Sequence, residues 1–137
     1  MSTRIESKHV EISASAETVY AYLNDFNNIK TLLPQDKISD WQATTDQCSF
    51  KIQNAAIIPL NKSTVEPNSK INIVSGDNAP FPFTLEIFII EKSNNLTEGY
   101  LLFDGEINAF LKMMVMKPLT NLFDYMAVQL KSELESA

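Results

Sequence analysis

The stretch VEISASAETVYAYL, residues 10–23, changes its hydrophobic period within a few positions. Val10 and Ile12 alternate with polar residues, which is typical of a strand with one buried face. Ser15 then has a side chain suited to a helix N-cap, and apolar residues follow it at helical spacing. The stretch therefore predicts a strand that passes directly into an amphipathic helix.

The flanks of this stretch extend both elements. The strand is predicted over residues 3–12, but Ile5 is out of phase with the later apolar positions, so either a bulge lies between them or the early part is frayed. After the helix, Ile29 and Leu33 are spaced by four and predict a second short helix, and Pro34 ends it. We thus expect two short helices directly after the first strand.

The following part of the chain changes to a period of two. In one run, Leu85 and Ile87 share a face opposite Glu86. Short polar turns separate the runs, which indicates antiparallel neighbours. Six strands are predicted, over residues 38–44, 47–54, 56–66, 69–76, 83–92 and 96–107.

The C-terminal part returns to helical spacing. Its apolar face consists of Leu119, Leu122, Phe123, Met126, Leu130 and Leu134, and continues upstream through Leu111, Met114 and Val115. Pro118 lacks an amide donor and crowds the preceding turn. We expect either a kink near residues 114–118 or two helices, the second with Pro118 in its first turn.

The composition excludes several classes of protein. The 137 residues include 17 acidic and 11 basic side chains, and a net charge of -6 disfavours binding to nucleic acid or to anionic membranes. With one cysteine (Cys48) and one histidine (His9), neither an internal disulfide nor a usual zinc site can form. Three glycines are too few for a glycine-rich phosphate loop. We expect no metal and no cofactor.

Organisation and location follow from what the sequence lacks. It has no internal repeat, no linker-like segment and no apolar stretch long enough for a membrane span, and its first residues are not apolar. We expect one domain over residues 1–137, located in the cytoplasm.

The order of elements resembles the SRPBCC (START-like, helix-grip) superfamily, which includes birch-pollen-allergen-like and polyketide cyclase-like proteins. Residues 10–23 look like that family's first strand and helix, and Asp25-Phe26-Asn27-Asn28 looks like its interhelical turn. Trp41 falls where an aromatic residue is common on the second strand. The resemblance, over roughly residues 3–134, implies an α+β fold in which a curved seven-stranded antiparallel sheet wraps around a long C-terminal helix.

What the resemblance implies for function is the binding of a small apolar molecule between sheet and helix. It carries over no catalytic residue, because the superfamily shares none. Our leading hypothesis is a non-enzymatic binding protein for a lipid-, sterol- or polyketide-like ligand. The residues expected to line the cavity are Trp41, Phe50, Ile52, Ile73, Phe83, Leu85, Ile87, Leu101, Phe103, Met114, Phe123 and Met126.

A second hypothesis is a cyclase or dehydratase that uses the same cavity. Asp104, Glu106 and Tyr100 would move protons there if they faced inward. The apolar residues Leu101 and Phe103 alternate with them, however, so we expect the acids to point to solvent. His9 is expected on the strand surface for the same reason.

A third hypothesis is a protein-interaction module or a homodimer with a filled core. Phe88 and Ile90, on the second face of their strand, would then form the contact surface.

Two further features remain open. Lys112 and Lys117 flank the proline and would suit an acidic ligand head, although helix lysines are usually solvated. Cys48 is expected to be a buried, unreactive thiol.

Overall fold

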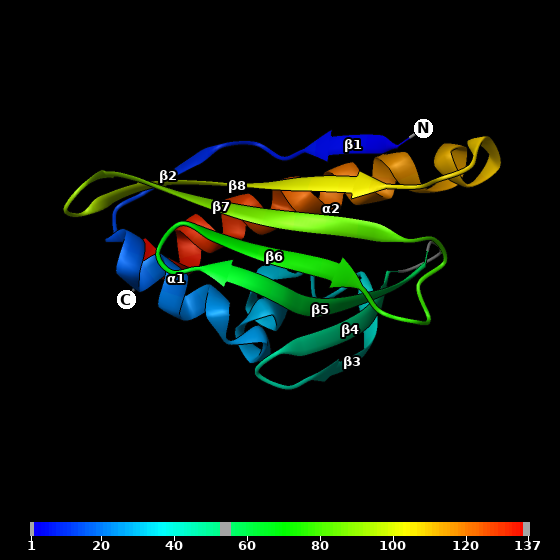
Figure 1. Cartoon of the computed structure of the whole chain (residues 1–137), viewed down its shortest axis with the longest axis horizontal. Coiled ribbons are helices and arrows are strands. Elements are labelled where there is room, and N and C mark those ends of the chain that lie inside the picture. The colour runs from blue at the N-terminus through cyan, green and yellow to red at the C-terminus, as the bar shows by residue number, and fades with distance from the viewer. Residues whose placement is uncertain (1, 53–55, 136–137) are drawn as a thin grey trace.

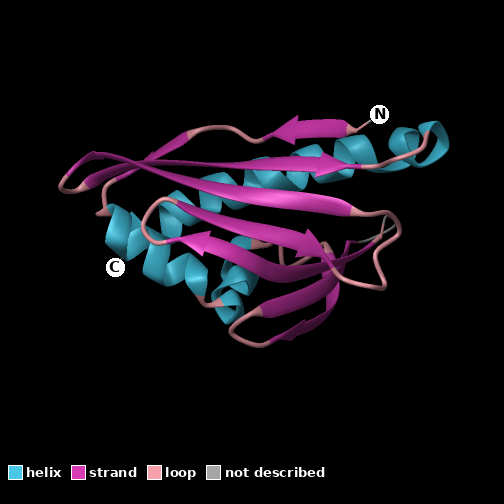
Figure 2. Ribbon diagram, in the orientation of Figure 1, coloured by secondary structure: helices cyan, strands magenta, loops and turns pink. Residues whose placement is uncertain are grey.

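A computed structural model describes residues 2–52 and 56–135, which form one curved antiparallel sheet with a long helix behind it (Figures 1 and 2). The long helix is α2 (Ala109–Glu135). The short helix α1 (Ala16–Asn24) and the 3-10 helix η1 (Phe26–Leu32) connect the second strand to the third. The expected α+β architecture is confirmed.

The sheet has eight strands, and every pair of neighbours is antiparallel. The spatial order is β1-β8-β7-β6-β5-β4-β3, and β2 also pairs with β8. The last two positions of the strand expected over 47–54 lie outside the described residues. The strands are β1 (Thr3–Glu6), β2 (Val10–Ile12), β3 (Ile38–Ala43), β4 (Gln47–Ile52), β5 (Ile57–Glu66), β6 (Lys70–Ser75), β7 (Phe83–Ser93) and β8 (Leu96–Gly105).

The strand expected over residues 3–12 is divided by a bulge. Glu6 is opposite Leu102 and Val10 is opposite Gly99, so three residues on the N-terminal segment face two on β8. Ser7 lies inside the bulge and is buried; its hydroxyl accepts a hydrogen bond from the amide of Leu101 at 2.9 Å. The extra residue brings Ile5 and Ile12 to the same buried face, and of the two alternatives it is the bulge that forms.

Both short helices have N-cap residues whose side chains accept a backbone hydrogen bond. The amide of Thr18 donates to the hydroxyl of Ser15 at 3.1 Å, which confirms the predicted N-cap of α1. Asp25 caps the next helix in the same way, because its carboxylate accepts from the amide of Asn27 at 3.0 Å. Only seven residues remain for this second helix, and it adopts the tighter 3-10 form.

Four phenylalanines fill the space between the sheet and α2. The ring centroid of Phe103, on β8, lies 5.4 Å from those of Phe83 and Phe123 and 6.3 Å from that of Phe81. Gly105 makes room for this arrangement, since a Cβ at that position would lie 2.8 Å from Cζ of Phe103. The sheet is therefore joined to the helix through aromatic contacts.

Helix α2 is continuous through Pro118, so the alternative of two separate helices is wrong. Its apolar face is buried from Val115 to Leu130, but Met114 is 50% exposed, against the expectation that it faces the sheet. At 100° per residue Met114 points about 140° away from the buried Leu119, so its side chain lies on the outward side of the helix. Among the described residues, no helix is long and apolar enough to span a bilayer.

The edge strand β3 is irregular. Its register with β4 shifts between Ser39 and Gln42, and Asp40 between them has a φ of 55°. A left-handed backbone conformation is uncommon for a residue other than glycine, although aspartate tolerates it better than most. The edge of the sheet is thus bent at its middle.

Replacing Phe103 with alanine is expected to destabilise the protein by about 3–5 kcal/mol, because the ring is 1% exposed and its removal leaves a cavity between β8 and α2. The free energy of unfolding would be measured by urea titration. Phe110→Ala is the matched control, since Phe110 is 71% exposed and its loss should change stability by less than about 0.5 kcal/mol. Equal losses in the two variants would contradict the central role of Phe103.

Candidate functional site

The residues expected to line a cavity lie together between the sheet and α2, with two exceptions. Trp41 is only half-buried, with its ring centroid 6.3 Å from that of Phe50. Met114 is outside this group, on the outward side of α2, and is 50% exposed. The other ten are buried and consist of Phe50, Ile52, Ile73, Phe83, Leu85, Ile87, Leu101, Phe103, Phe123 and Met126.

A cleft of about 570 Å³ opens at one side of this buried group. It lies between α2 and the segment that connects η1 to β3, and Ile52 at the end of β4 also lines it. Of the twelve expected residues, Ile52 is the one in its lining. The full lining is Pro34, Asp36, Lys37, Ile52, Lys117, Pro118, Asn121, Leu122 and Tyr125.

The cleft combines apolar walls with a net positive charge. Two lysines, Lys37 and Lys117, come from its opposite sides, and Asp36 is its one acidic residue. Within the described part of the chain, neither lysine forms an ion pair. A cationic rim beside apolar side chains suits a molecule with an acidic head and an apolar body.

Part of this site had a signal in the sequence. Lys117 and Pro118 were singled out on α2, and Pro34 marked the end of the second helix. Asn121 and Tyr125 carried no such signal, because helical spacing assigns them to the solvent face. Nothing in the sequence places the segment before β3 against the middle of a helix about eighty residues later.

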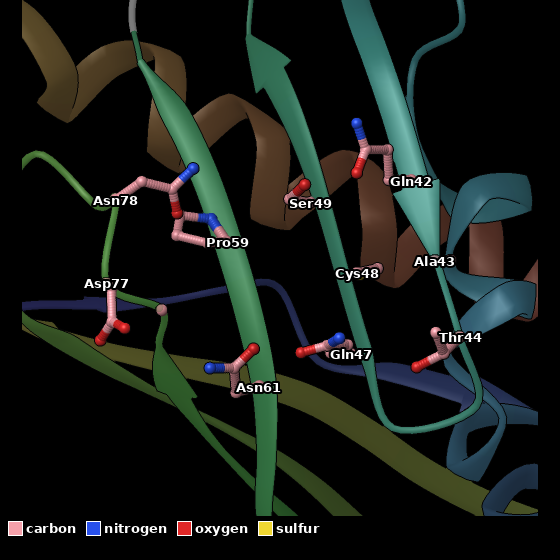
Figure 3. Close-up of a pocket in the computed structure, with 11 residues that line it drawn as sticks. Gln42, Ala43, Thr44, Gln47, Cys48, Ser49, Pro59, Asn61, Asp77 and Asn78 are labelled. Carbon is pink, nitrogen blue, oxygen red and sulfur yellow. The ribbon is translucent and has the colours of Figure 1, made fainter.

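A second hollow lies on the outer face of the sheet and is polar (Figure 3). Its volume is about 410 Å³. Gln47 and Ser49 alternate with the buried Cys48 and Phe50, and so point away from α2, toward Asn61 of the neighbouring strand. Most residues of its lining are polar, unlike the apolar walls expected for the ligand.

The acids of the enzyme hypothesis do not reach the interior. Asp104 alternates with the buried Phe103 and forms an ion pair with Arg4, 3.3 Å from Oδ2 to Nε. Glu106 is exposed, and Tyr100 stacks on Phe88 on the outer face, with ring centroids 4.8 Å apart. A proton-transfer site built from these residues inside the cavity is therefore not supported.

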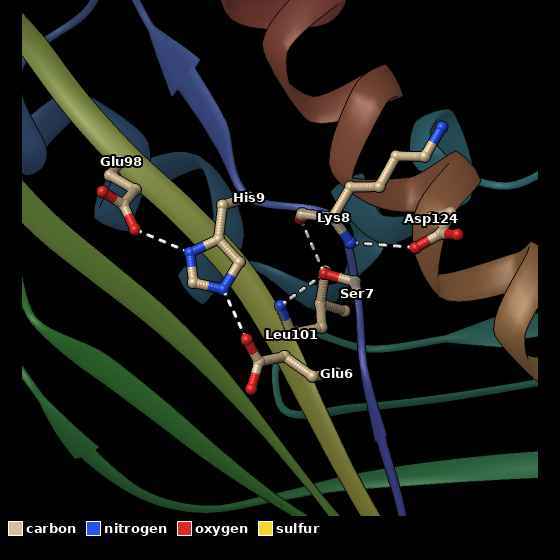
Figure 4. A network of polar contacts seen from close by, with 7 residues as sticks. All are labelled: Glu6, Ser7, Lys8, His9, Glu98, Leu101 and Asp124. Carbon is tan, nitrogen blue, oxygen red and sulfur yellow. Dashed lines mark hydrogen bonds and ion pairs between the residues drawn. The ribbon is translucent and has the colours of Figure 1, made fainter.

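His9 also lies on the outer face, as expected, within a network of charged groups (Figure 4). Its Nδ1 lies 2.7 Å from Oε2 of Glu98, and its Nε2 lies 2.7 Å from Oε2 of Glu6. Its ring stacks on Tyr100 with centroids 3.9 Å apart. The hydrogen bonds to Glu98 and then to Glu6 raise the pKa of His9 above its ordinary value of 6.5, against a smaller opposing effect of burial.

Cys48 is 4% exposed, and burial raises the pKa of its thiol to about 12. A thiol with so high a pKa is protonated at neutral pH and is a poor nucleophile. Its position on the inner face of β4 agrees with the expectation of a small buried side chain.

The same fold occurs in solved structures of other proteins. An aromatase/cyclase from a Streptomyces species, Zhui, superposes with a TM-score of 0.81 over 98% of this chain and 94% of its own, at 13% identity. The chain has the helix-grip fold. Norcoclaurine synthase from Thalictrum flavum superposes with a TM-score of 0.76 over 99% of this chain and 96% of its own, at 10% identity.

A START superfamily protein from Mycobacterium smegmatis has this helix-grip fold as well. It matches with a TM-score of 0.70 and 16% identity over 97% of both chains. No family model and no curated protein matches the sequence. The resemblance to the START-like proteins is thus confirmed at the level of the fold.

The His9 network predicts a pH-dependent contribution to stability. Both ring nitrogens face carboxylates, so the imidazolium is the form that donates to both. Because the folded-state pKa of His9 is raised, its contribution is fully present below pH 6.5 and is lost as the pH rises through the folded-state value. We expect His9→Gln to lower the Tm more at pH 5.5 than at pH 9. The same loss at both values would contradict this role.

Proposed function

We propose that this protein binds a small amphipathic molecule, with an acidic head at the rim of the cleft and an apolar body against its walls. The observation that carries the proposal is the cleft itself, where Ile52 and Leu122 provide apolar surface between Lys37 and Lys117. The molecular class is a fatty-acyl-, sterol- or polyketide-like acid. The cleft volume of about 570 Å³ falls within the usual range for sites that take small molecules.

The buried residues behind the cleft would take the far end of the apolar body. Ile52 shares the inner face of β4 with Phe50, and Leu122 precedes Phe123 on α2, so the cleft borders the elements that hold these rings. A ligand that enters between the rings would replace contacts among the phenylalanines with contacts to itself. Apolar burial would then supply most of the affinity, at roughly 25 cal/mol per Å².

Binding without catalysis is the form of the proposal that the residues favour. Two similar structures are an aromatase/cyclase and a synthase, but at 13% and 10% identity they are a guide to the fold alone. In this chain the acidic residues nearest the end of β8 are on the outer side, and the cleft contains one carboxylate, that of Asp36. One carboxylate without a second carboxylate or a histidine in the cleft lining is a weak basis for proton transfer.

The role of the lysines can be tested with two dyes that share an aromatic body. We expect 8-anilinonaphthalene-1-sulfonate, which is anionic, to bind better than neutral N-phenyl-1-naphthylamine. Lys117→Glu should weaken binding of the anionic dye about 10-fold or more, because a charge-assisted contact is lost. The affinity for the neutral dye should not change. Fluorescence titration gives both dissociation constants.

Lys112→Glu is the matched control for this experiment. Lys112 is an exposed lysine on the same helix and does not line the cleft, so its substitution makes the same change of net charge at a different place. Equal weakening by the two variants would show that overall charge, and not the cleft, attracts the dye.

A second test concerns the depth of the site. Met126 is 2% exposed on the inner face of α2, and Met126→Trp would occupy the space proposed for the apolar end of the ligand. We expect it to abolish binding of N-phenyl-1-naphthylamine at a cost of about 1–3 kcal/mol in stability from overpacking. Unchanged affinity in a folded variant would restrict the ligand to the cleft.

A further inference from the structure

The outward side of α2 has an apolar stripe that is not covered by the described part of the chain. Eight large hydrophobic residues are exposed among the described residues, and five of them are on this helix. Met113 is 87% exposed, which means that almost its whole side chain is in solvent. The five residues are Phe110, Met113, Met114, Tyr125 and Val128.

These residues share one face of the helix. At 100° per residue, Phe110 and Val128 point in the same direction, and the other three lie within about 60° of them. Lys117 and Asn121 occupy the middle of the same face and are also exposed. The stripe thus has an apolar patch at each end and a polar centre.

This arrangement is self-complementary. Phe110 and Val128 are equally far from residue 119, as are Met114 and Asp124, and Lys117 and Asn121. If two such helices lie antiparallel with a two-fold axis at the level of residue 119, each apolar end meets the opposite apolar end of its partner. A symmetric dimer requires such a surface, because the same patch is used on both copies.

We propose that a second copy of this chain covers the stripe, with the two α2 helices antiparallel. Phe110 then packs against the partner's Val128, and Met114 against the partner's Tyr125. Along the other edge of the contact between the two helices, Lys117 comes within reach of the partner's Asp124. The side chain of Asp124 is only half-buried and already accepts the amide of Lys8 at 2.9 Å, which holds its carboxylate in place.

The charges favour a second copy over a lipid surface. The net charge of -6 opposes an anionic membrane and a second copy alike, so the choice depends on the stripe, which has one lysine, Lys117, where an anionic lipid surface attracts a cluster of basic residues. A partner with a carboxylate opposite that lysine is a better match. Beyond this stripe the same face ends in Glu135, which is acidic.

The size of the stripe sets the expected strength of the dimer. From Phe110 to Val128 it is about 27 Å long, and a helix face about 10 Å wide gives roughly 300 Å² per copy. Specific complexes of standard size bury about 800 Å² per partner. We therefore expect a weak dimer that dissociates on dilution.

The proposed dimer also touches the cleft without depending on its ligand. Lys117, Asn121 and Tyr125 belong to both the stripe and the cleft lining, so the partner would lie at the cleft rim and compete there with an acidic ligand. The inference concerns the free protein, and it stands or falls separately from the proposed binding function.

Sedimentation velocity of the ligand-free protein, from about 1 to 500 µM, tests the proposal. The weight-average mass should rise toward twice the chain mass at the high end. Phe110→Glu and Val128→Glu should each weaken association about 10-fold or more. Ile90→Glu is the matched control, because Ile90 is 39% exposed on β7 and away from the helix, and this variant should associate like the wild type.

Three cysteine variants, one double and two single, test the antiparallel pairing. In oxidising conditions the double variant Phe110→Cys/Val128→Cys should form disulfide-linked dimers, while neither single variant should do so, because the two copies of each position lie about 27 Å apart. Cys48 does not interfere, since its thiol is buried.

Three results would overturn the proposal. The first is a monomer at every concentration, whether or not it binds vesicles of anionic phospholipid; binding would assign the stripe to a lipid surface. The second is a dimer that Phe110→Glu leaves intact. The third is crosslinking by the single variants, which would indicate a parallel arrangement.

Discussion

The contact between Phe103 and Phe123 connects the two halves of this structure. Phe103 is on β8, and this strand is hydrogen-bonded to three others, β1, β2 and β7. Phe123 is near the middle of α2, and the ring centroids lie 5.4 Å apart. Only three residues separate β8 from α2. Because this connection is short, the helix packs across the inner face of the strand that precedes it.

Most of the fold was predictable because its elements have simple hydrophobic periods. The strands over 83–92 and 96–107 were expected almost as they are, since each has a continuous buried face. The bulge at Ser7 was signalled by the phase of Ile5 alone. The continuity of α2 could not be predicted, because a proline within a helical pattern is compatible with a kinked helix and with two helices.

The candidate site was much less predictable than the fold. The cleft depends on Pro34 and Lys37 meeting Tyr125, and no local pattern reports a contact between residues so distant in sequence. Met114 illustrates a second limit. It was assigned to the apolar face together with Val115, but at 100° per residue it points about 140° away from the buried Leu119 and so toward solvent. Membership of an apolar run along the sequence does not fix the direction of each side chain in that run.

The bent edge strand has a consequence for how copies of this chain can meet. A flat edge strand offers unpaired amides and carbonyls to any other strand, which is a common route to fibres and to swapped domains. In β3 the left-handed turn at Asp40 and the shifted register break this row of groups into two short pieces. Open-ended growth of the sheet is thereby blocked at this edge.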